Sequence, residues 1–472
     1  MPELKGFCGP SGQSRSPFVA ADRTVNMYLQ ELDNERGRFA LFSMPGLRPV
    51  ALLPSAPVRG LCTTSTGRTF AVTSTTIFEI FAGWTVLSRG TIPTGTTPVS
   101  MIDNGIALFL SVNGEGRVLD LTSNVLTTVA PPGLAFARVF YLDGRLLSHD
   151  PGTRRFYFSD LFDALTWDPL SFYEAEGRPD PIATLFVDHR ELWIPGSQST
   201  EVWYSTGNSL DPFARMSGVF LEQGSGAPES FQALDNTLFW LGGTTRGESP
   251  VWMANGYQPV RVSTHALETA MSGMPTVADA IGFTARHGGH AWYGLDFPTG
   301  GETWLYDTST QAWTELADLQ AAGTLTNYPS HQHCSAFGFH LWGDSTTGQL
   351  YVWDPTYHRY GTKERLCERI APHLRGEGQR LTYHCFELLM QAGVGLDAAV
   401  SPGENPQVRL QWSDDGAQTW SMEHWRSAGR IGHTFERVRW HRLGQAYRQR
   451  AFRVGMTDPV QIALLGANVE AS

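Results

Sequence analysis

Residues 281–314 read IGFTARHGGHAWYGLDFPTGGETWLYDTSTQAWT, and this stretch decides the fold class. Short runs of apolar and aromatic residues alternate here with turns rich in Gly, Asp, Ser and Thr. Three of the runs carry a tryptophan: His290–Tyr293, Glu302–Asp307 and Gln311–Thr314. Short runs of this type, bounded by turn residues, predict antiparallel β-strands.

Similar sets of strands extend outward in both directions. They begin near residues 58, 99, 137, 182, 230, 281 and 334. The spacing of roughly 40–50 residues is typical of one four-stranded propeller blade. Paired tryptophan phrases recur in neighbouring sets, as in Glu191–Ile194 followed by Glu201–Tyr204. Large flat side chains at equivalent positions fill the space between adjacent blades.

The last set, within 333–354, offers only three strands, and residues 48–53 are predicted to close that blade. The chain is therefore predicted to be all-β, with a seven-bladed propeller over residues 48–358 and six blades as the alternative. A single helix is predicted over Ala266–Met271, with Thr264 as its cap and Gly273 as its stop.

The two flanks of the propeller differ from it in composition. Residues 359–472 contain several further strands and predict a C-terminal β-sandwich that serves as an interaction domain. Residues 1–47 have weak periodicity and many polar residues, and they are predicted to form an extended N-terminal arm on the surface.

Bulk composition excludes several classes of protein. Charged residues are 17% of the 472, and the net charge is −11, which argues against a protein that grips nucleic acid. No run is long and apolar enough to insert in a membrane, and no secretory leader is expected at the N-terminus. The five cysteines are scattered without a CxxC pair, which indicates free thiols and folding in a reducing cytoplasm. One local exception in charge is the arginine run Arg426, Arg430, Arg437, Arg439, Arg442, Arg448, Arg450 and Arg453, interpreted as a solvated or subunit-facing surface.

Two motifs contain residue types that can take part in catalysis or metal binding. The first is an Asp-box-like turn, whose structural residues are Ser413, Asp415, Gly416, Thr419 and Trp420. Its carboxylate and hydroxyl are expected to hold turn amides, so its role is structural. The second is His331 and His333, which fall on one face of a strand, although a zinc site needs further ligands. No catalytic residue, cofactor or metal ion is predicted, because the usual hydrolase and nucleotide-binding signatures do not occur.

Three phrases, in order along the chain, resemble the packaged-DNA stabilisation or tail hub (nozzle) proteins of short-tailed bacteriophages. The first is Arg23–Leu29 with Met44–Leu47, and the second is Pro259–Glu268 with Gly289–Pro298 and Trp304–Asp307. The third is Gln411–Gly416, Thr419-Trp420, Arg437–Trp440, Leu443-Gly444, Phe452–Val454 and Asp458–Val460. Together they span nearly the whole chain.

The resemblance implies a structural virion protein rather than an enzyme. In that family a homohexameric ring lies below the portal and adaptor rings, seals the packaged DNA and conducts it out during ejection. It also carries the tail needle, spike or fibre proteins. Double-stranded DNA would pass through the bore without sequence-specific binding.

The candidate interface residues lie in the sandwich. They are Trp425, Arg437, Arg439 and Trp440, and core packing explains the two tryptophans equally well. Two other functions remain open. A carbohydrate-binding phage tail protein predicts exposed tryptophans at equivalent blade positions, and a sialidase-like glycosidase predicts a central arginine cluster.

Overall fold

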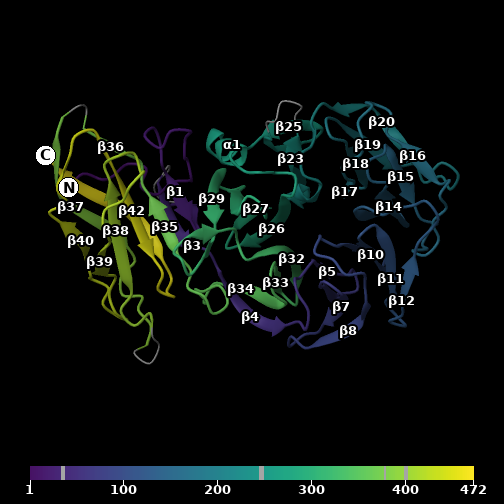
Figure 1. The fold of residues 1–472 in the computed structure, drawn as a ribbon, viewed down its shortest axis with the longest axis horizontal. Helices are drawn as coiled ribbons and strands as arrows, with labels where there is room; N and C mark the ends of the chain where they lie inside the picture. Colours follow the sequence, from purple (N-terminus) through teal and green to yellow (C-terminus); the bar gives the residue numbers. More distant parts are fainter. Residues whose placement is uncertain (33–37, 244–248, 377–378, 398–401) are drawn as a thin grey trace.

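Small antiparallel sheets follow one another around a ring, and a two-layered sandwich lies beside that ring at the other end of the long axis (Figure 1). The structure is a computed structural model that describes residues 1–32, 38–243, 249–376, 379–397 and 402–472. The predicted all-β class, a propeller followed by a β-sandwich, is confirmed. Among the described residues, no helix has the length and apolar character needed to cross a membrane.

Seven groups of strands, each antiparallel within itself, form the ring. They are, in chain order, β5 (Gly60–Thr63), β6 (Thr69–Val72), β7 (Thr76–Ile80) and β8 (Val86–Thr91); β9 (Ser100–Asp103), β10 (Ala107–Val112), β11 (Glu115–Asp120) and β12 (Leu126–Val129); β13 (Val139–Leu142), β14 (Arg145–His149), β15 (Arg155–Phe158) and β16 (Phe172–Glu174); β17 (Phe186–Asp188), β18 (Glu191–Pro195), β19 (Thr200–Ser205) and β20 (Phe213–Leu221); β21 (Gly224–Ser225), β22 (Gln232–Leu234), β23 (Thr237–Gly243), β24 (Val251–Asn255) and β25 (Gln258–Arg261); β26 (Ile281–His287), β27 (His290–Phe297), β28 (Glu302–Asp307) and β29 (Ala312–Leu316); and β32 (Ser330–Ala336), β33 (Phe339–Asp344), β34 (Gln349–Asp354) and β4 (Gly46–Leu52). The number of blades stays a prediction, and this grouping supports seven.

Each neighbouring pair of groups shares a hydrophobic cluster. Phe70 and Leu108 lie in the cluster between the first two groups, and Trp193 and Trp240 lie in the one between the fourth and fifth. Burying a large apolar side chain contributes about 1.5–3 kcal/mol, so these clusters stabilise the ring. The tryptophan phrases of the sequence supply many of these buried rings.

Strand β4 closes the ring. It pairs antiparallel with β34, from Gly46 opposite Asp354 to Leu52 opposite Gln349, and so supplies the fourth strand of the last group. Leu53 and Leu341 then join one cluster with Ala71 of the first group. This is the strand that the sequence analysis assigned to the last blade.

One α-helix, α1 (His265–Ser272), interrupts the strands between β25 and β26. The Thr264 hydroxyl caps it by accepting a hydrogen bond from the Leu267 amide, and Gly273 ends it. Leu267 and Met271 are buried against the neighbouring sheets. The predicted helix is confirmed, one residue longer at each end. The chain also forms the short elements η1 (Pro228–Ser230), β30 (Asp318–Leu319) and β31 (Leu325–Thr326).

The sandwich packs two sheets over one core. Its first layer contains β35 (Cys367–Ile370), β36 (Leu374–Arg375), β38 (Gln407–Ser413), β39 (His424–Ser427) and β42 (Gln449–Met456). Its second contains β37 (Leu381–Met390), β40 (Val438–His441), β41 (Gln445–Ala446) and β43 (Ala463–Ala471). Phe386, Phe452 and Trp440 lie in the core between them.

The prediction of an extended arm over residues 1–47 is wrong for its described part. β1 (Arg23–Val25), β2 (Met27–Glu31) and β3 (Phe39–Ser43) are strands of the two sandwich sheets, and β3 pairs with β43. Met27, Leu29 and Leu41 are buried in the sandwich core, which explains why this segment pairs instead of lying free on the surface.

The first strand also joins the two domains. β1 pairs in parallel with β29 of the ring and antiparallel with β35 of the sandwich, so one continuous sheet runs through both domains (Figure 1). Directly after β1, the buried Asn26 donates from its side-chain amide to the carbonyls of Ala317 and Leu366, both at 2.8 Å. Its side-chain oxygen accepts from the Ala317 amide and the Tyr360 hydroxyl.

Candidate functional site

Two arginines of the predicted interface share one carboxylate. Arg437 precedes β40 and Arg439 lies in it, opposite Glu387 of β37. The Nε atoms of both arginines donate to Glu387 Oε1 at 2.9 Å, and Arg439 also donates to Oε2 at 3.1 Å. One negative charge therefore faces two positive charges, and the Arg437 side chain remains largely exposed. This edge of the sandwich keeps an excess of positive charge.

The structure separates the two predicted interface tryptophans. Trp440 is 1% exposed, packs on Phe386, and donates from its indole nitrogen to the His424 carbonyl at 2.8 Å. Trp425 in β39 is 42% exposed. In this structure only Trp425 can contact a partner, and core packing accounts for Trp440.

The other arginines of the run also fall into two classes, those that pack within the sandwich and those that are exposed. Arg450 is buried, forms a bidentate pair with Asp414 at 2.7 Å, and lies over the Tyr383 ring. Arg453 lies over the Trp420 ring, 4.3 Å from its centroid. These two arginines stabilise the sandwich itself. Arg426, Arg430, Arg442 and Arg448 are exposed.

The Asp-box-like turn has the local hydrogen bonding that its residues predict. The Asp415 carboxylate accepts from the hydroxyl and amide of Thr419, from the Gln418 amide and from the Ser413 hydroxyl. These hydrogen bonds, those from Thr419 first, lower the pKa of Asp415 to about 2. Gly416 has a positive φ of 75°, and a β-carbon there would meet the Phe18 ring. These hydrogen bonds stabilise the turn.

The two histidines considered as metal ligands have different partners. His333 Nε2 lies 2.9 Å from His340 Nδ1, whereas His331 Nδ1 lies 3.3 Å from Asp296 Oδ2. A β-bulge between Ser330 and Gln332 shifts the register beside His331. Burial lowers the pKa of His333 to about 3, so it is neutral at physiological pH. Within the described ranges, no group of three or more His, Cys, Asp or Glu side chains is placed to hold a metal ion.

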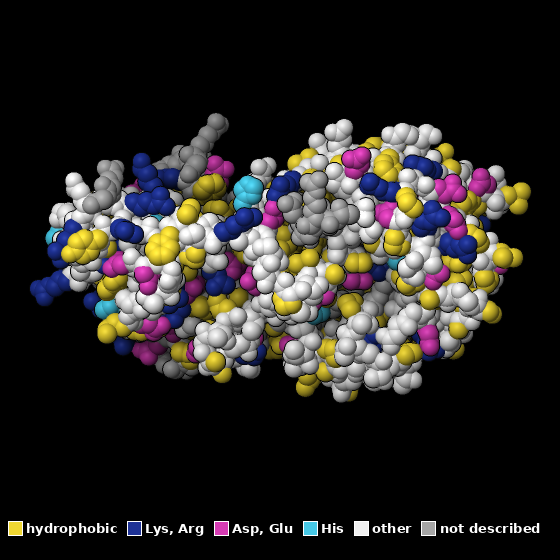
Figure 2. All heavy atoms as spheres, turned by 45° about the horizontal axis from the view of Figure 1, so that its top comes forward, with side chains coloured by type: hydrophobic (Ala, Val, Ile, Leu, Met, Phe, Trp, Pro, Cys, Tyr) yellow, Lys and Arg dark blue, Asp and Glu magenta, His cyan; other side chains and the backbone are white. Residues whose placement is uncertain are grey.

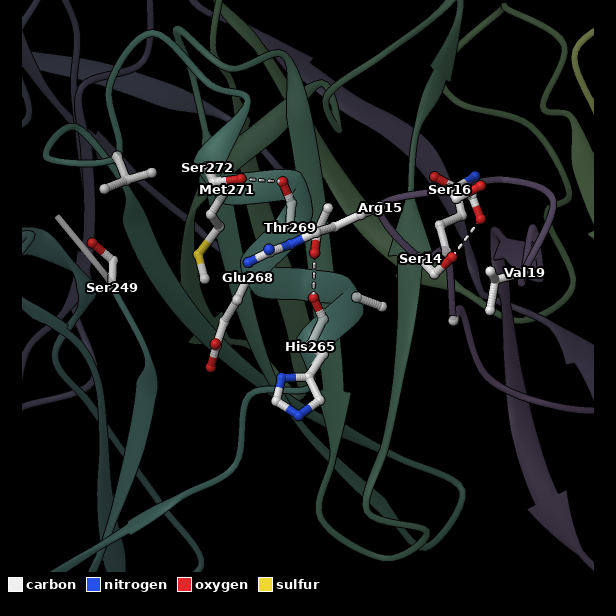
Figure 3. Close-up of a pocket in the computed structure, with 14 residues that line it drawn as sticks. Ser14, Arg15, Ser16, Val19, Ser249, His265, Glu268, Thr269, Met271 and Ser272 are labelled. Carbon is white, nitrogen blue, oxygen red and sulfur yellow. Dashed lines mark hydrogen bonds between the residues drawn. The ribbon is translucent and has the colours of Figure 1, made fainter.

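A cavity of about 600 Å³ lies between residues 12–19 and α1 (Figure 3). The Thr269 and Ser272 hydroxyls donate to helix carbonyls, and Ser14 donates to the Ser16 carbonyl (Figure 3). Glu268 supplies the carboxylate of the described lining, and it pairs with Arg261. A glycosidase needs two carboxylates across the scissile bond, so this cavity does not support that chemistry.

The tryptophans do not form a glycan-binding surface on the propeller. All fifteen tryptophans lie in the described ranges, and Trp425 of the sandwich is the one that is exposed. Trp240, Trp292, Trp313 and Trp342 are fully buried between blades. The carbohydrate-binding alternative required exposed tryptophans at equivalent blade positions, and this packing argues against it.

Two exposed apolar residues next to the arginines were not predicted from the sequence. Ile431 and Phe435 lie in the connection between β39 and β40, and Phe435 is 97% exposed. The sequence signal that could have identified them is an apolar residue within an arginine-rich segment that has the composition of a turn. Exposed apolar side chains of this kind, rimmed by charge, are typical of protein interaction sites.

Comparison with protein families assigns both domains. Residues 12–358 match the family model described as bacteriophage P22 Gp10, beta-propeller, and residues 367–472 match the model described as bacteriophage P22 Gp10, beta-sandwich. A search of curated proteins finds no match.

Several solved structures are distantly similar. The N-terminal domain of Nup159 is 10% identical, with 71% of this chain and 99% of that chain covered and a TM-score of 0.43. BamB from Moraxella catarrhalis is 14% identical, with 70% and 97% covered and a TM-score of 0.40. The WD40 propeller domain of Doa1 is 10% identical, with 66% and 97% covered and a TM-score of 0.40. Scores this low do not establish a common fold, so the family models alone assign the chain.

Proposed function

Because the chain belongs to the bacteriophage P22 Gp10 family, the packaged-DNA stabilisation or tail hub proteins of short-tailed phages, we propose that it forms the hub ring of a phage tail. It is a structural phage protein, and its place is in the virion. In this proposal six copies form a ring below the adaptor, keep the packaged DNA inside the capsid and conduct it out during ejection. The single observation that carries the proposal is the family match over both domains.

The fold suits a mechanical role. Each pair of adjacent groups in the ring is joined by its own buried cluster, and β1 joins the ring to the sandwich in one sheet. Closed packing of this kind leaves few free strand edges, which limits unwanted pairing with other chains. A protein that holds DNA under pressure needs this rigidity more than it needs a binding pocket.

The net negative charge of the protein is compatible with a channel through which DNA passes. The net charge is −11, so the protein as a whole repels the phosphate backbone. Duplex DNA could slide past such a surface without being held. We propose that the protein is not an enzyme and that its partners are the adaptor and portal proteins, together with the distal needle, spike or fibre proteins. Synthesis would take place in the host cytoplasm before assembly.

Electron microscopy tests the proposal. The purified protein is imaged alone and after mixing with the adaptor ring encoded by the same genome, with an adaptor ring from an unrelated phage as the control. We expect six copies on the matching ring, around a bore that admits duplex DNA. Protein that never binds the matching ring would overturn the proposal.

A second experiment tests the seal. Phage particles assembled without this gene are expected to package DNA and then to lose it, and expression of the gene in trans should restore DNA-filled heads. Heads that retain their DNA without the protein would contradict the sealing role.

A further inference from the structure

The connections of the propeller expose apolar residues on one side only. In a four-stranded antiparallel sheet, the turns after the first and third strands lie on the same side. Every large apolar side chain that is exposed in a described connection of the ring lies on that side. These residues are Phe81, Ile106, Val125, Leu161, Phe162, Leu165, Leu170, Leu210, Tyr257 and Phe337.

Half of them lie in two connections of consecutive groups, and we call these five residues the distal patch: Leu161, Phe162, Leu165, Leu170 and Leu210. Four come from the connection between β15 and β16, and Leu210 comes from the connection between β19 and β20. The hydroxyl of Tyr173, in β16 directly after the first connection, donates to Asp211 of the second connection at 2.5 Å. Leu170 is 83% exposed and Leu210 is 93% exposed. Exposing them to water costs free energy that a partner would recover.

Buried residues anchor the connection between β15 and β16, which carries four of the five patch residues. Trp167 and Ala164 are buried against the blades, and the Trp167 indole donates to the Ala164 carbonyl at 3.1 Å. Asp163 accepts from the Leu165 amide and the Thr166 hydroxyl. The leucines therefore project from an ordered loop, which lowers the entropy cost of binding through them.

The distal patch is acidic as well as apolar. Residues 159–171 and 206–212 contain four aspartates and no Lys, Arg or Glu, and Arg145 from outside these segments donates to the Ser159 carbonyl at 2.7 Å. A partner that fits this surface must combine exposed apolar side chains with positive charge.

The same chain carries a surface of that type. Residues 424–442, which we call the arginine segment, contain five arginines and one glutamate, and they expose Trp425, Ile431 and Phe435. The two halves of the molecule differ in the same sense. Residues 1–358 hold 20 Lys and Arg against 34 Asp and Glu, and residues 359–472 hold 15 against 12.

The two surfaces lie at opposite ends of the long axis. In Figure 1, β39 and β40 lie at the left end, and β15 and β16 lie toward the right end. Figure 2 shows apolar side chains along that right-hand end of the propeller. One molecule cannot bring its own two surfaces together, but two copies placed head to tail can.

We propose that the distal patch of one copy binds the arginine segment of a second copy. This inference rests on the proposed ring and names the surfaces that would join its subunits. A contact between two different surfaces is heterologous, and it closes into a ring when the rotation between copies divides the circle. The leucines would pack against Phe435, Ile431 and Trp425, and the aspartates would face the arginines.

Mixing two variants tests the contact. The patch variant is L170K/L210K, which places positive charge where the arginines should dock. The segment variant is R430E/F435E. L52K, at an exposed site on β4 outside both surfaces, is the matched control. All five positions are exposed, so the variants should fold, and circular dichroism checks this.

Sedimentation velocity on the full chain should then distinguish the arrangements. Wild type and L52K should associate as concentration rises, and each double variant should associate about tenfold or more weakly. A mixture of the two variants should form dimers and nothing larger, because one intact surface remains on each chain. Variants that associate like wild type would overturn the contact, and chains that stay monomeric in solution are compared on the adaptor ring.

Imaging on the adaptor ring separates this inference from the function on which it rests. Complete rings of wild-type protein, with incomplete rings of the patch variant, would support the contact. Equally complete rings of both would overturn the contact and leave the proposed hub function standing. Wild-type protein that never binds the adaptor would overturn the proposed function itself.

Discussion

The Asn26 side chain connects three segments that are far apart in sequence. It binds Ala317 after β29, Leu366 before β35 and Tyr360, and it has a positive φ of 57°. We expect Asn26→Ala to destabilise the protein by roughly 2–4 kcal/mol, because it leaves several buried polar groups without a partner. Urea denaturation followed by tryptophan fluorescence measures the change.

The control for Asn26 is Asn236→Ala. Asn236 also has a positive φ, but it lies in an exposed turn. Its replacement measures the cost of placing alanine in the left-handed region together with the loss of one exposed hydrogen bond to His189. Equal losses of stability in the two variants would show that the buried hydrogen bonds of Asn26 contribute nothing.

We expect His333 to make the fold sensitive to acid. Burial lowers its pKa from 6.5 to about 3, so the unfolded chain binds a proton that the folded chain does not between these values. Stability should therefore fall as the pH drops from about 6.5 to 3. In His333→Phe the difference between urea midpoints at pH 7 and pH 4 should be smaller than in wild type.

His189 provides a control of opposite sign. It is exposed, and its hydrogen bond to Asp188 raises its pKa. Its contribution to stability is present below its unfolded pKa and is lost as the pH rises through the folded value. His189→Gln should leave the acid sensitivity in place. If His333→Phe retains the full acid sensitivity of wild type, buried His333 is not its source.

At the scale of elements, the closure of the ring depends on a close approach at the start of β4. A β-carbon on Gly46 would lie on the backbone of Tyr357, a contact that no side-chain rotation can relieve. We expect Gly46→Ala to destabilise the protein by about 1–3 kcal/mol or more, because β4 must shift away from β34. Thermal denaturation measures the effect.

Gly273→Ala is the matched control for Gly46. Gly273 ends α1 with a negative φ, and a β-carbon there would meet one carbonyl oxygen at 3.4 Å. This substitution should change the midpoint little. A Gly46→Ala variant as stable as Gly273→Ala would show that β4 accommodates the extra carbon.

Local signals made most elements of the ring predictable. Thr264 and Gly273 define the ends of α1, and Gly, Asp and Asn turns separate the strands. The N-terminal strands escaped prediction because their partners are distant: β1 pairs with residues 315 and 368–370, and β3 pairs with β43. No local pattern reports such pairing.

The candidate site was only partly predictable for the same reason. Trp425 and Trp440 lie in strands that are consecutive in sequence but belong to different sheets. Trp425 is exposed, whereas Trp440 lies in the core. Arg437 and Arg439 share Glu387, which lies about fifty residues earlier. Burial and ion pairing of this kind are set by packing between sheets, which the sequence reports only indirectly.

For the whole molecule, the excess of negative charge predicts its behaviour toward DNA. We expect no measurable binding of duplex DNA at physiological salt, because the protein carries a net charge of −11. Fluorescence anisotropy with a labelled duplex tests this. Tight binding that weakens steeply with salt would show that the arginine segment holds DNA phosphates rather than a partner protein.

The chain should also resist division into its two domains. A fragment that starts at residue 44 keeps β4 but lacks β1, β2 and β3, whose Met27, Leu29 and Leu41 belong to the same core cluster as Phe386 and Val454. We expect that fragment to aggregate or to unfold at lower temperature than the full chain, as size-exclusion chromatography and calorimetry would show. A fragment as stable as the full chain would contradict the role of these strands.

The sheet that the two domains share should transmit force between them. Because β1 lies between β29 and β35, a pull on the sandwich is carried into the ring through the backbone pairing of Val25 with Glu315 and the hydrogen bond from the Asn26 amide to the Glu315 carbonyl. Bonds loaded together yield later than bonds broken one at a time. The molecule should therefore turn as a stiff lever, and a small displacement at the sandwich end becomes a tilt of the whole ring.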